Sequence, residues 1–324
     1  MKDDQTREGK MALDSQIEGL LTAMKDAGAR PFEDMTVPEA RLASWDFVGL
    51  QGEAEPVARV MHRYVPGPTA DIPVRIYYPN DAGESALPVI MYFHGSGFVI
   101  INIEICDATC RAIANRSGCA LVAVNYQKAP EHKFPAAVDD AWAATKWVVE
   151  HAEELGVDAS RIAVMGDSAG GNLAAVMALR ARDEGGPSLA CQVLVYPVTD
   201  GGIDTDSYRA NAEGYLLQRE TMRWFFNHYQ SGAADADNPY YSPLRAKDHT
   251  RLPPALIITA EYDPLRDDGR LYAAKLKDAG VDATLWDCPG MTHAFFWMQG
   301  ICDYTKKIHD DTGKWLRERL VKKP

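Results

Sequence analysis

The sequence predicts an α/β protein whose mostly parallel central sheet has about eight strands flanked by helices. Three observations support this fold class. Several short runs are apolar at nearly every position, which is typical of parallel strands covered by helices on both faces. Stretches with helical periodicity alternate with these runs. The chain of 324 residues is also long enough to bury one large core.

Residues 1–55 are expected to form helices ahead of the sheet. Apolar residues recur at steps of three and four from Leu13 to Met24, which predicts an amphipathic helix. Gly28 and Pro31 are its stop signals, and a second short helix is expected after Pro38. Because these helices need a surface to pack on, we assign residues 1–55 to the N-terminal part of a cap.

Residues 56–199 are expected to hold the first part of the core. "VARVMHRYV" and "IPVRIYYP" flank the turn-rich "PGPTAD", which predicts an antiparallel pair. Parallel strands are then expected in "PVIMYF", "ALVAVNY", "RIAVMG" and "CQVLVY". A further parallel strand is expected in "PALIITA" (254–260), in the second part of the core. Helices are expected at 104–117, 136–154, 169–182 and 265–279. A last strand at 282–288 and a helix from about 301 to 320 complete the core, whose second part is 251–324.

Residues 200–250 interrupt the alternation, because they contain helical patterns but no strand pattern. The segment "LLQRETMRWFFNHYQSG" places aromatic residues at helical spacing, which ordinary core packing would also explain. An insertion of this size at the carboxyl edge of a parallel sheet usually covers a ligand site. We therefore expect residues 200–250 to form a helical cap insertion together with the N-terminal helices.

Composition excludes several functions. The formal net charge of −12 disfavours nucleic acid and provides no polybasic membrane face. No apolar run approaches the roughly 20 residues of a membrane span, and the charged start "MKDDQTREGK" lacks the apolar stretch of a signal peptide. Six cysteines without a CxxC pair predict free thiols in a reducing cytoplasm. The histidines lack metal-ligand spacing, so we expect neither a metal nor a cofactor.

Ser168 is the predicted nucleophile. It stands in "GDSAG" (166–170), between a predicted strand and a predicted helix, which is the context of the G-x-S-x-G nucleophile elbow. Gly166 and Gly170 let strand and helix pass closely, and the start of the helix offers free N–H groups. These features together make Ser168 a stronger candidate than an isolated five-residue match.

A serine nucleophile needs a base and a residue that orients the base, in the chain order Ser, Asp or Glu, His for this architecture. Asp263 follows a predicted strand, and His293 lies in the loop after the last one. Asp267 and Asp268 are expected in the first turn of a helix instead, where acidic groups favour the dipole. Asp287 remains a second candidate for the orienting carboxylate.

A second serine, Ser96, lies in "HGSGF" (94–98) directly after a predicted strand. The loop at this place supplies oxyanion-hole N–H groups in enzymes with the elbow. We therefore expect Ser96 to contribute its backbone N–H to the site, while Ser168 attacks.

The chain resembles the bacterial hormone-sensitive-lipase-like (family IV) carboxylesterases of the α/β-hydrolase fold. The resemblance rests on five motifs in family order: "HGSGF", "NYQKAPEHKFPAAVDDA", "GDSAGGNLA", "DPLRDDG" and "HAF". It implies a triad of Ser168, Asp263 and His293, and oxyanion donors in the backbone N–H groups of Ser96, Gly97 and Ala169. It also implies supporting roles for His94, Gly95 and Asp167.

Two departures from the family pattern stand out. Ser96 replaces the middle glycine of H-G-G-G-F, so a positive φ there would strain the backbone, and its hydroxyl would narrow the pocket or bond to the substrate. Asn125, Gln127 and Lys128 differ from the usual D-Y-R-L, which puts the supporting salt bridges of that block in question.

The resemblance implies hydrolysis of short- to medium-chain acyl esters through an acyl-enzyme, with a small-molecule ester as the partner. Expected pocket residues are Trp45, Phe47, Phe98, Trp224 and Phe225. Related scaffolds serve as a dehydratase or a small-ligand receptor, and amide hydrolysis is a further alternative. His293 argues against the receptor, because the gibberellin receptors of this kind lack the histidine. Family homodimers suggest pairing through the edge strand 282–288.

Overall fold

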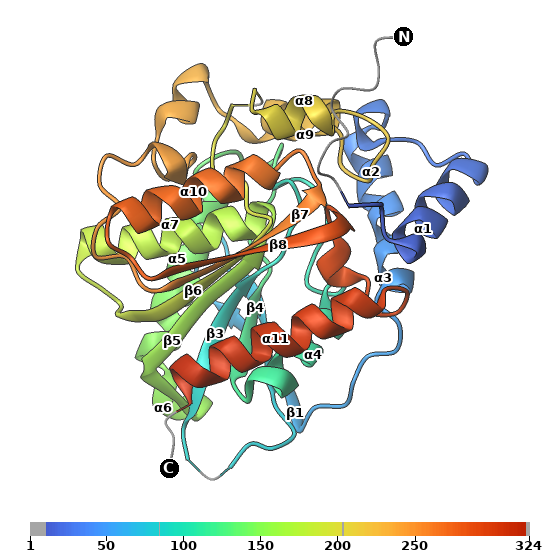
Figure 1. Ribbon diagram of the computed structural model, residues 1–324. Helices are drawn as coiled ribbons and strands as arrows, with labels where there is room; N and C mark the ends of the chain where they lie inside the picture. Colours follow the sequence, from blue (N-terminus) through green and yellow to red (C-terminus); the bar gives the residue numbers. More distant parts are fainter. Residues whose placement is uncertain (1–10, 84, 203, 322–324) are drawn as a thin grey trace.

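The computed structural model describes residues 11–83, 85–202 and 204–321 (Figure 1). Its strands form one sheet in the order β1-β2-β4-β3-β5-β6-β7-β8. β2 pairs antiparallel with β1 and β4, whereas all other neighbours are parallel. The α/β-hydrolase fold predicted from the sequence is thereby confirmed. The strands are β1 Arg59–Val65, β2 Ile72–Tyr78, β3 Leu87–Phe93, β4 Ala120–Val124, β5 Val157–Asp167, β6 Leu189–Val195, β7 Ala255–Tyr262 and β8 Ala283–Thr292.

Helices cover both faces of this sheet (Figure 1). The core helices are α4 Asp107–Ser117, α5 Ala136–Glu150, α6 Ala152–Leu155, α7 Ala169–Glu184, α10 Arg266–Asp278 and α11 Asp303–Leu320. α7 packs on β5 and β6, with α5 beside it and α10 on β7, whereas α4 and α11 pack together on the opposite face. The inner strands β2, β3, β4, β6 and β7 are largely buried, whereas the edge strands β1 and β8 are partly exposed. This burial explains why the inner strands read as continuous apolar runs.

Apart from η5 Phe295–Trp297, which follows β8, the remaining helices precede β1 or lie between β6 and β7. They are α1 Ser15–Asp26, η1 Phe32–Asp34, α2 Val37–Ala43, η2 Ser44–Asp46, α3 Phe47–Leu50, α8 Asp206–Ala210, α9 Arg219–Tyr229, η3 Ala233–Asp237 and η4 Pro243–Arg245. Figure 1 shows α8 and α9 beside α2 at one end of the sheet. The Phe32 and Phe225 rings lie 6.2 Å apart, and the Thr221 hydroxyl donates to the Glu33 carboxylate. The two segments expected to form a cap are thus in contact.

Several elements, α4 and β5 among them, begin or end a few residues from the expected bounds, and two further differences have a visible cause. The predicted helix 136–154 is interrupted at His151, whose backbone leaves helical geometry (φ −108°, ψ 18°) and whose Nδ1–H donates to the Trp147 carbonyl. The last strand continues beyond Cys288 to Thr292, because Thr292 still pairs with Tyr262 after a register shift in β7. This extension leads the chain directly to His293.

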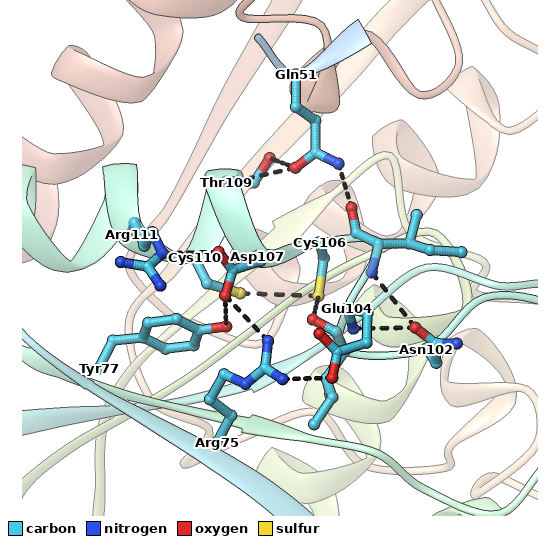
Figure 2. A network of polar contacts seen from close by, with 12 residues as sticks. Gln51, Arg75, Tyr77, Asn102, Glu104, Cys106, Asp107, Thr109, Cys110 and Arg111 are labelled. Atoms are coloured by element: carbon cyan, nitrogen blue, oxygen red, sulfur yellow. Dashed lines mark hydrogen bonds and ion pairs between the residues drawn. The ribbon is translucent and has the colours of Figure 1, made fainter. Parts of the chain in front are cut away.

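A polar network fixes the segment after α3 against the core (Figure 2). Gln51 donates to the Ile105 carbonyl and accepts from Thr109, at the start of α4. Next to these contacts, Asp107 accepts from Arg75 at 3.0 Å and from the Tyr77 hydroxyl at 2.8 Å. Because α4 follows the loop after β3, these bonds tie the N-terminal helices to that loop. Among the described residues, no helix is long and apolar enough to cross a membrane.

Candidate active site

Ser168 lies in the tight turn between β5 and α7. Its backbone has φ 56° and ψ −119°, a conformation that costs a non-glycine residue free energy and is typical of functional turns. A Cβ at Gly166 or Gly170 would collide with the backbone of the neighbouring segment, which includes Phe93. These two glycines therefore allow β5 and α7 to approach closely. The side chain of Ser168 lines the cavity described below.

His293 joins Ser168 to Asp263. Its Nδ1 lies 2.7 Å from Oδ2 of Asp263, and its Nε2 lies 3.0 Å from Oγ of Ser168. An ionised carboxylate only accepts, so Nδ1 carries the proton and Nε2 is left to accept from the serine hydroxyl. Asp263 is fully buried and also accepts from the backbone N–H of Leu265 at 2.8 Å. The structure thus brings together the three residues singled out by their order in the chain.

The competing carboxylates are engaged elsewhere. Asp267 accepts from the backbone N–H of Ser207, and Asp268 accepts from that of Thr199. Asp287 forms two bonds of 3.0 Å with the Arg270 guanidinium. Of the candidates considered, Asp263 alone contacts His293.

The loop after β3 and the first residue of α7 supply unengaged backbone donors. The N–H groups of Ser96, Gly97 and Ala169 have no acceptor within the described parts of the chain. Gly97 has φ 55°, and a Cβ there would overlap the Phe225 ring. The positive φ angles of this loop fall on Gly97 and Phe98 rather than on Ser96, so the serine does not carry the backbone strain considered above.

Asp167 connects the elbow to this loop. Its Oδ1 accepts from the Tyr92 hydroxyl at 2.6 Å and from the Gly95 N–H at 2.9 Å. Burial raises the pKa of Asp167 to about 6, while these two hydrogen bonds oppose the shift. A Cβ at Gly95 would strike the same carboxylate. The loop after β3 therefore sits directly on the residue that precedes Ser168.

His94 is fully buried and stacks on Tyr126 with ring centroids 4.6 Å apart. Burial lowers the pKa of His94 to about 3, so its imidazole is neutral near pH 7.

The residues Asn125, Gln127 and Lys128, which differ from the family's D-Y-R-L block, nevertheless form hydrogen bonds. Lys128 Nζ donates to Asn125 at 2.9 Å, and the backbone N–H of Gln127 donates to Asp140 at 2.8 Å.

A cavity of about 60 Å³ opens on Ser168 and His293. Its apolar walls are Phe32, Phe47, Ile100, Ile101, Leu216, Leu217, Phe225, Ala294 and Trp297. Of the aromatic residues expected in the pocket, only Phe47 and Phe225 line it. Sequence reasoning missed Phe32 and Trp297, which lie in short 3₁₀ turns without a periodic pattern.

Three expected pocket residues lie elsewhere. Trp45 is 47% exposed on η2. Phe98 stacks on Tyr229, with ring centroids 3.8 Å apart, beneath the loop. Trp224 lies on another side of α9 from Phe225 and contacts the His228 ring edge-on at 4.5 Å. None of these three residues lines the cavity.

No group of three or more His, Cys, Asp or Glu side chains in the described ranges is placed to hold a metal ion. All six cysteines are buried and unpaired, and the Cys106 and Cys110 sulfurs lie 3.8 Å apart.

Comparison with known proteins gives the class of this fold and site. A family model described as an alpha/beta hydrolase fold matches residues 90–297. Carboxylesterase NlhH of Mycobacterium tuberculosis is 46% identical, over 69% of this chain and 71% of its own length. Ethyl acetate hydrolase of Pseudomonas putida is 41% identical, over 72% of this chain and 74% of its own. A crystal structure of a thermostable esterase from Pseudomonas putida superposes with a TM-score of 0.92 at 35% identity, covering 97% of this chain and 100% of that one.

The fold and the elbow thus define an α/β hydrolase. Within that class, the chain belongs to the hormone-sensitive-lipase-like family of carboxylesterases.

Proposed function

We propose that this protein hydrolyses short- to medium-chain carboxylic esters through an acyl-enzyme formed on Ser168. The observation that carries the proposal is His293, hydrogen-bonded to Asp263 on one side and to Ser168 on the other. Nucleophile, base and orienting carboxylate in this arrangement perform acyl transfer on several unrelated folds.

The reaction follows from the donors and acceptors present. His293 Nε2 takes the hydroxyl proton as Ser168 Oγ attacks the ester carbonyl, and Asp263 stabilises the imidazolium that forms. The N–H groups of Ser96, Gly97 and Ala169 bind the oxyanion. His293 then protonates the leaving alkoxide, which releases the alcohol. In the second half, a water molecule gives a proton to His293 Nε2 as it attacks the acyl carbon. His293 then returns this proton to Ser168 Oγ as the bond between Oγ and the acyl carbon breaks, which releases the carboxylic acid and regenerates Ser168.

The size and lining of the cavity support small apolar esters. A volume of about 60 Å³ between apolar walls leaves little room beside the reacting carbonyl. The name of one relative, ethyl acetate hydrolase, describes a small ester as substrate. We propose esters rather than amides as substrates, because an amine is the poorer leaving group. The esterase names of the relatives give no support to a dehydratase or receptor role.

Ser168→Ala tests the proposal with p-nitrophenyl butyrate as substrate. We expect hydrolysis to fall to near background while the circular dichroism spectrum and the urea midpoint stay close to wild type. Asp287→Asn is the matched control, because it alters a carboxylate in β8 that does not contact His293. Activity retained by the Ser168 variant would remove that serine from the mechanism.

A further inference from the structure

One hydroxyl chain spans the oxyanion loop, residues 94–98. The backbone N–H of Phe98 donates to Ser96 Oγ at 2.9 Å. Ser96 Oγ lies 2.6 Å from the Tyr126 hydroxyl, which in turn donates to the His94 carbonyl at 2.6 Å. This chain of hydrogen bonds thus begins at Phe98, the last residue of the loop, and ends at His94, the first.

The direction of this chain follows from its ends. A carbonyl only accepts, so the single proton of the Tyr126 hydroxyl goes to His94. Ser96 Oγ must therefore donate its own proton to Tyr126, while it accepts from Phe98. The serine hydroxyl has no proton left for a substrate, which excludes the substrate bond considered from the sequence. All the groups of the chain are buried, Ser96 being 4% exposed and Tyr126 fully buried.

The loop held in this way is strained and carries unengaged donors. Phe98 has φ 62°, a left-handed conformation that persists in a non-glycine residue only when its surroundings fix it. Its N–H bond to Ser96 and its ring stacked on Tyr229 provide that fixation. Between the two ends of the chain lie the N–H groups of Ser96 and Gly97, which the proposed mechanism uses. Fixed donors stabilise a transition state better than donors that must reorganise.

We propose that Ser96 is a positioning residue for ester hydrolysis: its hydroxyl, through Tyr126, holds the loop so that the N–H groups of Ser96 and Gly97 stay aimed at the oxyanion. The inference rests on the proposed function. It assigns a role to the side chain of Ser96, in addition to that of its backbone, and it makes Tyr126 part of the same device although that residue does not line the cavity.

The test uses Ser96→Ala, Tyr126→Phe and the double variant, with steady-state kinetics on p-nitrophenyl butyrate. Loss of an oxyanion donor outright costs about 10²–10³ in kcat. Because these variants loosen the donors without removing them, we expect kcat to fall about tenfold and KM to stay within about twofold. The double variant should lose about as much as either single variant, since both break the same chain. The inhibition constant of a trifluoromethyl ketone, which forms a tetrahedral adduct with serine, should rise by a similar factor.

Two matched controls separate positioning from stability. Ser117 is buried and accepts from the N–H two residues on, at 3.3 Å from Cys119, as Ser96 does from Phe98. Tyr78 is buried and donates to a backbone carbonyl, that of Leu155, at 2.8 Å. Ser117→Ala and Tyr78→Phe should lower the urea midpoint as the test variants do, with kcat unchanged.

The outcomes are distinguishable. Wild-type turnover that depends on Ser168, combined with unchanged kcat in both Ser96→Ala and Tyr126→Phe, would overturn the inference and leave the proposed function intact. A fall in kcat of the double variant equal to the product of the two single falls would also overturn the inference. A change in KM with kcat unaltered would do the same. If Ser96→Ala does not fold, Tyr126→Phe decides the question by the same criteria. A wild-type protein without esterase activity would overturn the function and the inference together.

Discussion

His293 Nδ1 and Asp263 Oδ2 lie 2.7 Å apart, although 30 residues separate them in the chain. β7 ends one residue before Asp263, and β8 ends one residue before His293. Since these strands are parallel neighbours, both side chains leave the sheet at the same edge. The pairing thus follows from sheet topology, and it fixes which imidazole nitrogen faces Ser168.

Asp263→Asn should lower kcat by about 10⁴, the scale known for the corresponding change in another Ser-His-Asp enzyme. An asparagine amide donates to Nδ1, which moves the imidazole proton to Nε2 and removes the acceptor for Ser168. The measurement is kcat on p-nitrophenyl butyrate. Asp287→Asn should keep kcat within about twofold, because the partners of that carboxylate are Arg270 and Thr259. The reverse ranking of the two variants would make Asp287 the orienting residue.

Phe225→Ala should shift the acyl preference toward longer chains. The Phe225 ring lies on Gly97 and contacts Phe32, so that it closes the cavity on the cap side. Its removal lengthens the space beside the reacting carbonyl, and kcat/KM for p-nitrophenyl octanoate relative to the acetate should rise several-fold. Trp224→Ala removes the neighbouring aromatic ring, which does not line the cavity, and should leave the ratio unchanged. An equal shift in both variants would contradict a specific role for Phe225.

His309→Gln should reduce the acid sensitivity of the fold. His309 is fully buried and donates from Nε2 to the Phe296 carbonyl at 2.7 Å. Burial lowers the pKa of His309 to about 3, below the 6.5 of an exposed imidazole. The unfolded chain therefore binds one proton more between these pH values, so this residue's contribution to stability is complete above pH 6.5 and falls as the pH drops toward 3.

Urea unfolding at pH 7 and pH 5 measures this effect. Across the interval from pH 6.5 to 5, the wild type should lose about 2 kcal/mol more than His309→Gln, at about 1.4 kcal/mol per pH unit for one proton. Glutamine is chosen because its amide can still donate to the Phe296 carbonyl. An equal loss in both proteins would show that His309 titrates normally in the folded state.

The fold and the choice of Ser168, Asp263 and His293 follow from the sequence because local patterns carry them. Apolar runs marked the parallel strands, and the glycines around Ser168 marked the elbow. Asp263 and His293 were identified because each follows a strand end, and strand ends meet at one edge of a parallel sheet. The extension of β8 to Thr292 depends on pairing with β7, which no local pattern reports.

The residues that line the pocket are harder to predict from the sequence, because their placement also depends on tertiary packing. Phe225 was found on an amphipathic helix, but the neighbouring Trp224 was assigned to the cavity as well, because helical spacing alone does not tell which face meets the substrate. Trp45 lies in a short 3₁₀ turn whose orientation depends on its packing. The bond between Ser96 and Tyr126 joins residues 30 positions apart, so only the folded chain reveals it.

The most direct test of the mechanism is covalent labelling with diethyl p-nitrophenyl phosphate, followed by peptide mass spectrometry. This reagent phosphorylates an activated serine and releases nitrophenol. We predict a single diethylphosphoryl group on the peptide that contains Ser168, none on the peptide that contains Ser96, and no labelling of Ser168→Ala. A label on Ser96, or an unlabelled Ser168 in a protein that still hydrolyses esters, would contradict the account.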